Sequence, residues 1–112
     1  MDKNMMMQAM QAMQEMQKRM GEAQEKLKTM SVTHEGGNGL VKVTISGELK
    51  VTKIEIDENA RKTEEADVLE DLLITTINKA IESASKMKEQ ELAASTQGLL
   101  PNIPGMNLPF GM

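Results

Sequence analysis

Few residues in this 112-residue chain are suited to catalysis or metal binding. There is one histidine, His34, and no cysteine, so neither a histidine cluster for a metal nor a thiol nucleophile is available. Neighbouring carboxylates occur at Glu64–Glu65 and Glu70–Asp71, where a helix is expected to begin, and acidic side chains there complement the helix dipole. The sequence therefore predicts no catalytic residue, no metal site and no cofactor, and it argues against an enzyme.

Two further patterns look like ligand sites and are better interpreted as structure. The stretch Gly36–Gly39 is rich in glycine, as phosphate-binding loops are, but no Lys-Ser/Thr pair follows and a strand is expected next. The chain also holds twelve methionines. Thioether sulfur binds soft metals, yet such a site would want histidine or cysteine beside it, and the methionine-rich stretch has neither. We interpret the glycines as a turn and the methionines as packing residues.

Composition and charge limit the partners. The net charge of −4 and pI near 5.0 argue mildly against nucleic-acid binding, because DNA-binding domains usually carry a basic excess. Phe110 is the only aromatic residue, so no stacking platform for single-stranded nucleic acid is expected. The chain lacks an apolar run of the roughly 20 residues that cross a membrane, and Met1–Met7 lacks the pattern of a secretory signal. A cytoplasmic protein is expected.

The first structural element is a helix predicted from about Lys3 to Met30, a stretch without proline. Its apolar residues recur at steps of three and four, which makes a narrow seam. A seam of this kind needs a partner, and three are open: a helix of the same chain, a second copy of the protein, or a cofactor. Ion pairs are expected between Glu15 and Arg19 and between Glu22 and Lys26. The seam consists of Met6, Ala9, Met13, Met16, Met20, Ala23, Leu27 and Met30.

Three strands are expected after this helix. Ser31–Glu35 forms the first, with Val32 and His34 on one side. A tight turn at Ser46–Leu49 joins the other two, and Gly47 is expected to supply the positive φ of a type II′ hairpin turn.

That turn predicts which side chains share a face of the hairpin. One face is the core face, and the other meets a partner chain or solvent. Lys42 and Lys53 are expected to lie opposite each other, which costs stability unless an anion lies between them. The core face holds Val41, Val43, Ile45, Thr52, Ile54 and Ile56, and the other holds Leu40, Lys42, Thr44, Leu49, Val51 and Lys53.

A second long helix follows a polar connection that contains one helical turn around Asn59–Lys62. Asp67 and Glu70 form a capping box that starts this helix, which runs to about Ala93. Its broad apolar stripe, widened by Leu72, Ile74 and Ile81, is expected to pack on the sheet and on the first helix. The polar turns after Met87 are expected to project away from the core.

The last fifteen residues differ from the rest. Residues 98–112 hold all three prolines and are apolar without a period. We interpret residues 1–97 as a single α-β-β-β-α domain, and 98–112 as an irregular tail that either docks on a neighbour or stays mobile.

Segments along nearly the whole chain carry a family resemblance. In order they are MMMQAMQAMQEMQKRM (5–20), GLVKVT (39–44) followed by Gly47, VTKIEID (51–57), LEDL (69–72), INKA (77–80), and an ending with Gly98-Leu99-Leu100, Pro104-Gly105 and Pro109. This ordered set resembles the YbaB/EbfC nucleoid-associated proteins of bacteria. The resemblance implies an α+β fold of order α-β-β-β-α, with a long helix at each end of a three-stranded antiparallel sheet. It also implies a tweezer-like homodimer whose projecting helices surround double-stranded DNA, and no enzymatic activity.

The resemblance carries no short DNA-contact motif, so the candidates are basic residues on the two long helices. The alternative for each is a solvated side chain paired with a nearby glutamate. A second basic cluster lies on the hairpin at Lys42, Lys50 and Lys53. The DNA-binding candidates are Lys18, Arg19, Lys26, Lys28, Lys79, Lys86 and Lys88, and the dimer-interface candidates are Leu40, Leu49, Val51, Met13, Met16 and Met20.

Two functions remain open. The first is a nucleoid-localised homodimer that binds duplex DNA mainly through its backbone, with effects on nucleoid organisation and gene expression. The second is a protein-binding adaptor that uses the methionine-rich helix and the apolar tail, with DNA binding incidental. Neither involves a membrane or a small-molecule substrate.

Overall fold

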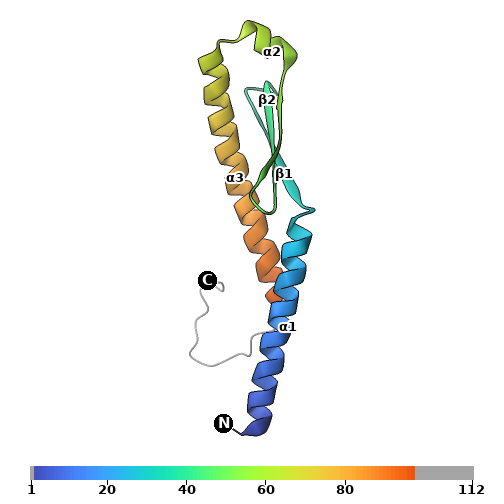
Figure 1. Cartoon of the computed structure of the whole chain (residues 1–112). Coiled ribbons are helices and arrows are strands. Elements are labelled where there is room, and N and C mark those ends of the chain that lie inside the picture. Colours follow the sequence, from blue (N-terminus) through green and yellow to red (C-terminus); the bar gives the residue numbers. More distant parts are fainter. Residues whose placement is uncertain (1, 98–112) are drawn as a thin grey trace.

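The computed structural model describes residues 2–97 (Figure 1). The strands form one antiparallel sheet in the order β1-β2-β3, so the predicted α-β-β-β-α order is confirmed. The short helix α2 is the helical turn expected around Asn59–Lys62, while the predicted tail at 98–112 lies outside the described residues. The elements are α1 (Lys3–Leu27), β1 (Ser31–Gly36), β2 (Val41–Ser46), β3 (Val51–Ile56), α2 (Glu58–Thr63) and α3 (Ala66–Thr96).

The core lies between α3 and two of the three strands. α3 packs against β1 and β2 (Figure 1). Val43 and Ile45 of β2 are fully buried against Ala80 and Ala84 of α3. Because alanine is small, the helix backbone approaches the sheet closely, and the core that results is thin.

The two long helices extend beyond the sheet, where they pack against each other. The C-terminal half of α1 contacts α3 of the same chain, and its residues Ala23 and Leu27 are buried, Leu27 lying against Gly47 of the β2–β3 turn. The N-terminal half continues past the end of α3 (Figure 1). The turns of α3 after Met87 do leave the core of the sheet. They do not project alone, however, because they lie along α1. The molecule is accordingly elongated, 73 × 26 × 16 Å.

Side-chain caps begin two of the helices but not the third. Asp2 accepts a hydrogen bond from the Met5 amide (2.8 Å) at the start of α1, and Asp57 caps α2. The predicted capping box of α3 is wrong, since the helix begins at Ala66 and its N-cap residue makes no side-chain hydrogen bond. Asp67 therefore lies within the first turn, where its charge complements the helix dipole.

The turn between β2 and β3 is longer than predicted. The Ser46 amide donates to the Lys50 carbonyl (2.9 Å), which leaves three residues in the loop. Leu49, not Gly47, has the positive φ, at 65°. Gly47 is needed for another reason: a β-carbon there would lie 2.5 Å from the carbonyl oxygen of Leu27, so only glycine fits against the end of α1.

The longer turn changes the register of β3. Thr44 lies opposite Lys53, but the pairing slips by one residue at the next position, so that Ile45 lies opposite Val51. Side chains directly opposite each other point to the same face, and Val51 therefore belongs to the face that α3 covers in part. The prediction that Val51 lies on the other face is wrong.

The predicted apposition of Lys42 and Lys53 is also wrong. Lys42 lies opposite Glu55, and Lys53 lies opposite Thr44. Lys42 forms an ion pair with Glu35 of β1 (Nζ–Oε1, 3.4 Å), and Lys53 forms one with Glu55 (3.0 Å). Charges on this face of the sheet are thus balanced by acidic neighbours, and the repulsion expected from the sequence does not arise.

Candidate nucleic-acid interface

The seven basic residues predicted to contact DNA fall into two groups. Three of them form ion pairs with glutamates: Arg19 with Glu15 (3.2 Å), Lys26 with Glu91 (2.9 Å) and Lys28 with Glu25 (2.9 Å). The other four form no ion pair within residues 2–97, so their charges are available to an outside anion. These four are Lys18, Lys79, Lys86 and Lys88.

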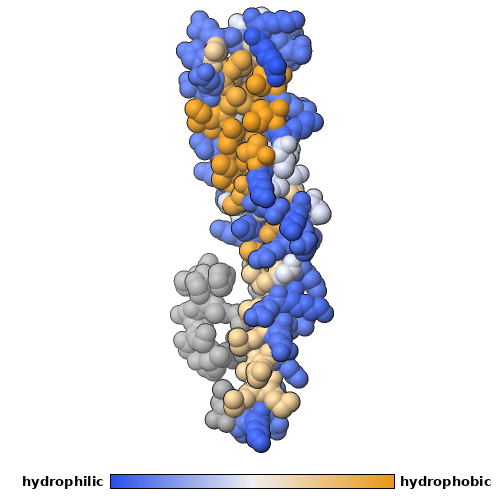
Figure 2. Space-filling model, viewed as in Figure 1, coloured by the Kyte–Doolittle hydropathy of each residue, from blue (hydrophilic) through white to orange (hydrophobic). Residues whose placement is uncertain are grey.

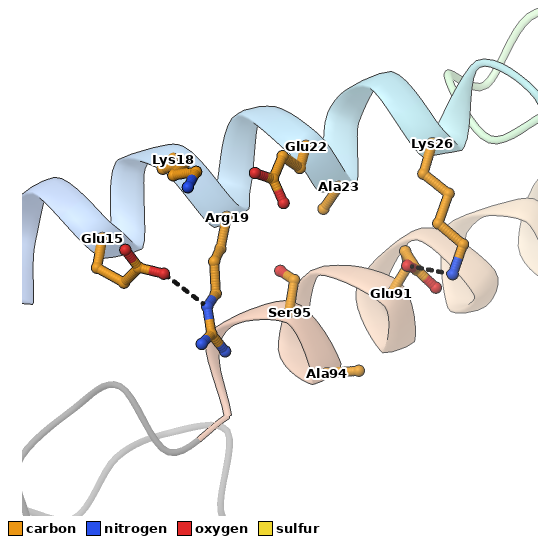
Figure 3. A pocket seen from close by; sticks show the side chains of 9 residues that line it. All are labelled: Glu15, Lys18, Arg19, Glu22, Ala23, Lys26, Glu91, Ala94 and Ser95. Carbon is orange, nitrogen blue, oxygen red and sulfur yellow. Dashed lines mark hydrogen bonds and ion pairs between the residues drawn. The ribbon is translucent and has the colours of Figure 1, made fainter.

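A groove between α1 and the last turns of α3 brings several of these side chains together (Figure 3). Three basic residues and three glutamates line it, so their formal charges cancel. The expected pair of Glu22 with Lys26 does not form, because Lys26 reaches across to α3 instead, while the expected pair of Glu15 with Arg19 is confirmed. The lining consists of Glu15, Lys18, Arg19, Glu22, Ala23, Lys26, Glu91, Ala94 and Ser95.

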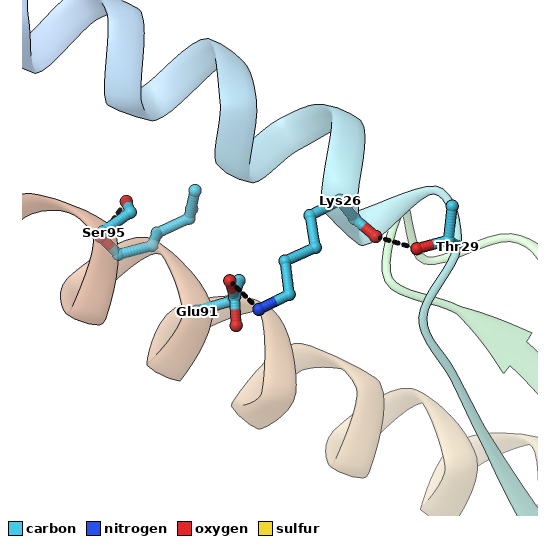
Figure 4. A network of polar contacts seen from close by, with 5 residues as sticks. Lys26, Thr29, Glu91 and Ser95 are labelled. Atoms are coloured by element: carbon cyan, nitrogen blue, oxygen red, sulfur yellow. Dashed lines mark hydrogen bonds and ion pairs between the residues drawn. The ribbon is translucent and has the colours of Figure 1, made fainter.

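The end of α1 is held by a small polar network (Figure 4). The Lys26 ammonium binds Glu91, whose side chain is only 19% exposed, while the Lys26 carbonyl accepts a hydrogen bond from the Thr29 hydroxyl (2.7 Å). The first contact joins the two helices, and the second closes the turn that leads from α1 into β1. Ser95 donates to the Leu92 carbonyl within α3 (2.8 Å).

Two ion pairs each shift the pKa of one half-exposed side chain. A hydrogen bond from Lys28 to Glu25, together with the charge of Glu25, raises the pKa of Lys28 above its usual value. A hydrogen bond from Lys53 and the charge of that lysine lower the pKa of the Glu55 carboxyl. Both shifts favour the charged forms of these side chains.

The unpaired lysines of α3 lie on two sides of the helix. Lys79 and Lys86 are seven residues apart, about two helical turns, and therefore share one side. Lys88 follows Ile74 and Ile81 at the same seven-residue spacing and shares the side that carries those apolar residues. Lys18 lies on α1 in the groove.

An exposed apolar surface extends over α3 and the neighbouring sheet, on a side that α3 leaves partly uncovered (Figure 2). We call it the β3–α3 face and define it by Val51, Ile54, Ile74 and Ile81, which are between 40% and 59% exposed. Ile74 and Ile81 were expected to pack on the sheet. They remain uncovered because α3 lies over β1 and β2.

The predicted dimer-interface residues are scattered by comparison. Val51 is part of the β3–α3 face, Leu49 is exposed in the neighbouring turn, and Leu40 is half-buried. Met16 and Met20 of α1 are also half-buried, whereas Met13 is 63% exposed. Sequence reasoning missed Ile54, Ile74 and Ile81 as surface residues. Their apolar spacing is the same as that of core residues, so nothing in the sequence separates the two.

The remaining candidates for chemistry have structural roles. His34 forms a hydrogen bond of 2.7 Å with Ser83, which joins β1 to α3. Across residues 2–97, no group of three or more histidine or acidic side chains is arranged to hold a metal ion. Within the same residues, no helix is long and apolar enough to cross a membrane.

Known proteins are similar to this chain in sequence and in fold. A nucleoid-associated protein of Methylococcus capsulatus is 39% identical over 89 residues, which is 80% of this chain and 81% of that protein. One of Rickettsia akari is 38% identical over 94 residues, 83% of this chain and 86% of its own length. The crystal structure of an uncharacterized Helicobacter pylori protein, 20% identical, has the same fold, with a TM-score of 0.57 over 67% of this chain and 87% of that one.

The family model extends the match to nearly the whole length. The model of the YbaB/EbfC DNA-binding family matches residues 2–99, which include both long helices and all three strands. With two relatives above 35% identity over most of their length, the chain belongs to the YbaB/EbfC DNA-binding family.

Proposed function

We propose that this protein binds double-stranded DNA as a homodimer, mainly through contacts to the phosphate backbone. Two observations carry the proposal. The chain belongs to a DNA-binding family, and both long helices, α1 and α3, hold lysines that have no acidic partner in residues 2–97. Such lysines add positive potential, whereas the paired ones are already neutralised. The binding would place the protein on the nucleoid, where it would affect DNA organisation and gene expression.

The shape and burial of a single chain support the homodimer. A compact chain of this length has a radius of gyration of about 13 Å. The radius of gyration of this chain is 20.7 Å, so the chain is far from compact and its core is small. The β3–α3 face is contiguous and apolar, and surfaces of that kind mark interfaces. A second copy placed on it would cover Ile54 and Ile74 and would leave the ends of α1 and α3 free as arms.

Contacts to the backbone rather than to bases fit the side chains that the arms carry. Lysine is a flexible point charge that binds phosphate without demanding one geometry. Arg19, the one arginine on the arms, is held by Glu15. Since the net charge is −4, binding has to come from local clusters such as Lys79 with Lys86, not from the overall charge.

The test is the affinity for unrelated duplexes as a function of salt concentration. We expect similar affinities for different sequences and a linear fall of log K with log salt, with a slope of about −0.9 for each phosphate contacted. Fluorescence anisotropy with labelled duplexes measures both. Absence of binding at low salt would reject the DNA proposal, and a strong preference for one sequence would reject backbone recognition.

Substitutions on the β3–α3 face test whether the protein forms a dimer through that face. Ile74→Asp combined with Ile81→Asp is expected to convert the dimer into monomers, measured by sedimentation equilibrium, because two carboxylates would be buried in an apolar interface. Val68→Asp is the matched control. Val68 is 40% exposed, as Ile81 is, but it lies in the first turn of α3, where a carboxylate complements the helix dipole. A monomeric wild-type protein at micromolar concentration would contradict the homodimer.

One observation favours a second function, that of a protein-binding adaptor. The N-terminal half of α1 exposes five methionines, and flexible thioether side chains suit adaptable protein contacts. Capture of partners from a nuclease-treated lysate separates the two functions. Partners bound by wild-type protein and lost when Met10 and Met13 are changed to glutamine would support the adaptor, whereas loss of all partners on nuclease treatment would support DNA bridging.

A further inference from the structure

The apolar seam of α1 continues beyond the helix that covers it. Ala23 is buried against α3, and the same side of α1 carries Met16, Ala12, Ala9 and Met5 at steps of seven, four, three and four residues. α3 ends at Thr96, and its residues Ala94 and Ser95 line the groove with Glu15–Ala23. The part of the seam that is N-terminal to Glu15 therefore has no helix of this chain over it within residues 2–97 (Figure 1).

This uncovered part is chemically unlike the rest of the surface. Asn4–Gln14 contains only methionine, glutamine, alanine and asparagine, with no charged residue. Five methionines in it are exposed by between 52% and 63%. Without a cation, this segment cannot neutralise the charge of a phosphate, and its methionines donate no hydrogen bond to one, so binding to the DNA backbone does not account for the methionines. We call Asn4–Gln14 the methionine arm.

The chain that follows α3 has matching chemistry and starts at the right place. Residues 98–112 also contain no charged residue, and they hold four large aliphatic residues and the only aromatic one: Leu99, Leu100, Ile103, Leu108 and Phe110. α1 and α3 are antiparallel, because Lys26 meets Glu91 while residues nearer the N-terminus, such as Glu15, line the groove with Ser95. The chain leaving Thr96 is therefore directed toward the N-terminal end of α1.

The tail is also long enough to cover the arm. From Glu15 to Met5 the helix rises about 15 Å. Fifteen residues of extended chain span up to about 50 Å, so even a strongly bent tail reaches the first turn of α1. Three prolines limit the freedom of the unbound segment and so reduce the entropy lost when it docks.

We propose that residues 98–112 dock on the methionine arm of their own chain and continue the cover that α3 provides over Ala23. The methionine arm is then an interaction surface for the tail, independent of DNA binding and of the β3–α3 face. Thioethers suit this role because they adapt their shape to an irregular, proline-containing segment.

A spin label gives a direct test in the full chain. Because the protein has no cysteine, Asn107→Cys provides a single attachment point for a nitroxide in the tail. With methionine methyl groups labelled with carbon-13, the signals of Met10 and Met13 are expected to lose most of their intensity. The signal of Met30, which lies just after the C-terminal end of α1, is expected to keep its intensity. A label at Glu48→Cys, in the β2–β3 turn, is the matched control and should leave Met10 and Met13 unchanged.

A mixing experiment tests whether the docked tail belongs to the same chain or to a second copy of the protein. Spin-labelled protein of natural isotope abundance is mixed with carbon-13-labelled protein that carries no spin label. Docking within one chain predicts no loss of signal at Met10 in the mixture. In an equal mixture about half of the possible partners carry a spin label, so a loss about half of that in the doubly labelled sample would show docking from a second copy. No loss in either sample would show that the tail does not bind the arm. Both of these results overturn the proposal.

Substitution of the tail gives a second readout. Leu99→Ser, Leu100→Ser, Ile103→Ser and Phe110→Ser together are expected to raise the rate of peroxide oxidation of Met10 and Met13 about threefold, since oxidation follows exposure of the sulfur. Asn102→Ser with Asn107→Ser changes polar tail positions only and should leave the rates as in the wild type. Mass spectrometry of the peptides measures each rate, and circular dichroism checks that the helices are intact. Equal rates in the wild type and the apolar variant would contradict docking.

Discussion

Gly47 lies so close to Leu27 that a β-carbon on Gly47 would be 2.5 Å from the Leu27 carbonyl oxygen and 2.9 Å from the Leu27 β-carbon. The Gly47 amide donates a hydrogen bond to the carbonyl of Met30 (2.9 Å). The β2–β3 turn is thereby held against the end of α1 by backbone contacts. These contacts help to set the direction in which the α1 arm leaves the sheet.

Replacement of Gly47 by alanine is expected to destabilise the protein by about 1–3 kcal/mol, because the nearest obstructing atom is the backbone carbonyl oxygen of Leu27, which cannot move aside as the end of a side chain can. Urea unfolding at one fixed protein concentration measures the change. Gly21→Ala is the control, since Gly21 is within α1 with nothing within 4 Å of a β-carbon. There alanine should stabilise by about 0.5–1 kcal/mol. An equal free energy of unfolding for Gly47→Ala and the wild type would show that the β2–β3 turn can move away from Leu27 without loss of stability.

The Lys26–Glu91 pair is expected to contribute about 0.5–1 kcal/mol, the upper part of the range for pairs that are partly exposed. Glu91 is the better-buried partner, with 19% exposure against 60% for Lys26. A double-mutant cycle with Lys26→Met and Glu91→Gln measures the coupling by urea unfolding. The Glu25–Lys28 pair at the end of α1 is the comparison. Both of its side chains are exposed, so its coupling energy should be close to zero. Equal coupling energies for the two pairs would contradict the expectation that partial burial of Glu91 strengthens its ion pair with Lys26.

Neutralising the unpaired lysines is expected to lower the dependence of DNA affinity on salt. If Lys79 and Lys86 each contact a phosphate, Lys79→Gln with Lys86→Gln should reduce the slope of log K against log salt by about 1.8. Anisotropy titrations at several salt concentrations give the slope. Lys53→Gln is the control, because Lys53 is already paired with Glu55. A slope unchanged by the double substitution would remove these two lysines from the interface.

The Glu55 carboxyl is expected to titrate below the usual value of 4.5, because Lys53 donates a hydrogen bond to its charged form. Since the folded pKa is lowered, the pair stabilises the protein above the unfolded pKa, and this contribution is lost as the pH falls through the folded pKa. NMR titration of the carboxyl carbon measures the midpoint. Lys53→Gln should move the midpoint of Glu55 upward, and no movement would show that the lysine is not the cause.

The helices, the strands and their order were largely predictable because they depend on neighbours in the sequence. The three-and-four spacing from Met6 to Leu27 predicted α1, and the glycines at 36–39 predicted the turn before β2. The predicted ends of the helices were less accurate. α1 ends at Leu27 and not at the predicted Met30, and α3 begins one residue before the predicted Asp67. The segments shared with the family were readable for the same reason, as they are short runs of consecutive residues.

Contacts between distant segments were decided only by the tertiary structure. Lys26 had a partner at the correct helical spacing in Glu22, yet it binds Glu91, which lies 65 positions away in the sequence. The register of β3 depends on a three-residue loop that a glycine–glutamate pair did not indicate. Ile74 and Ile77 are the same residue type on one apolar stripe, but Ile77 packs on the core and Ile74 is 59% exposed. Periodicity tells which residues share a side of a helix, whereas burial depends on what other segment covers that side.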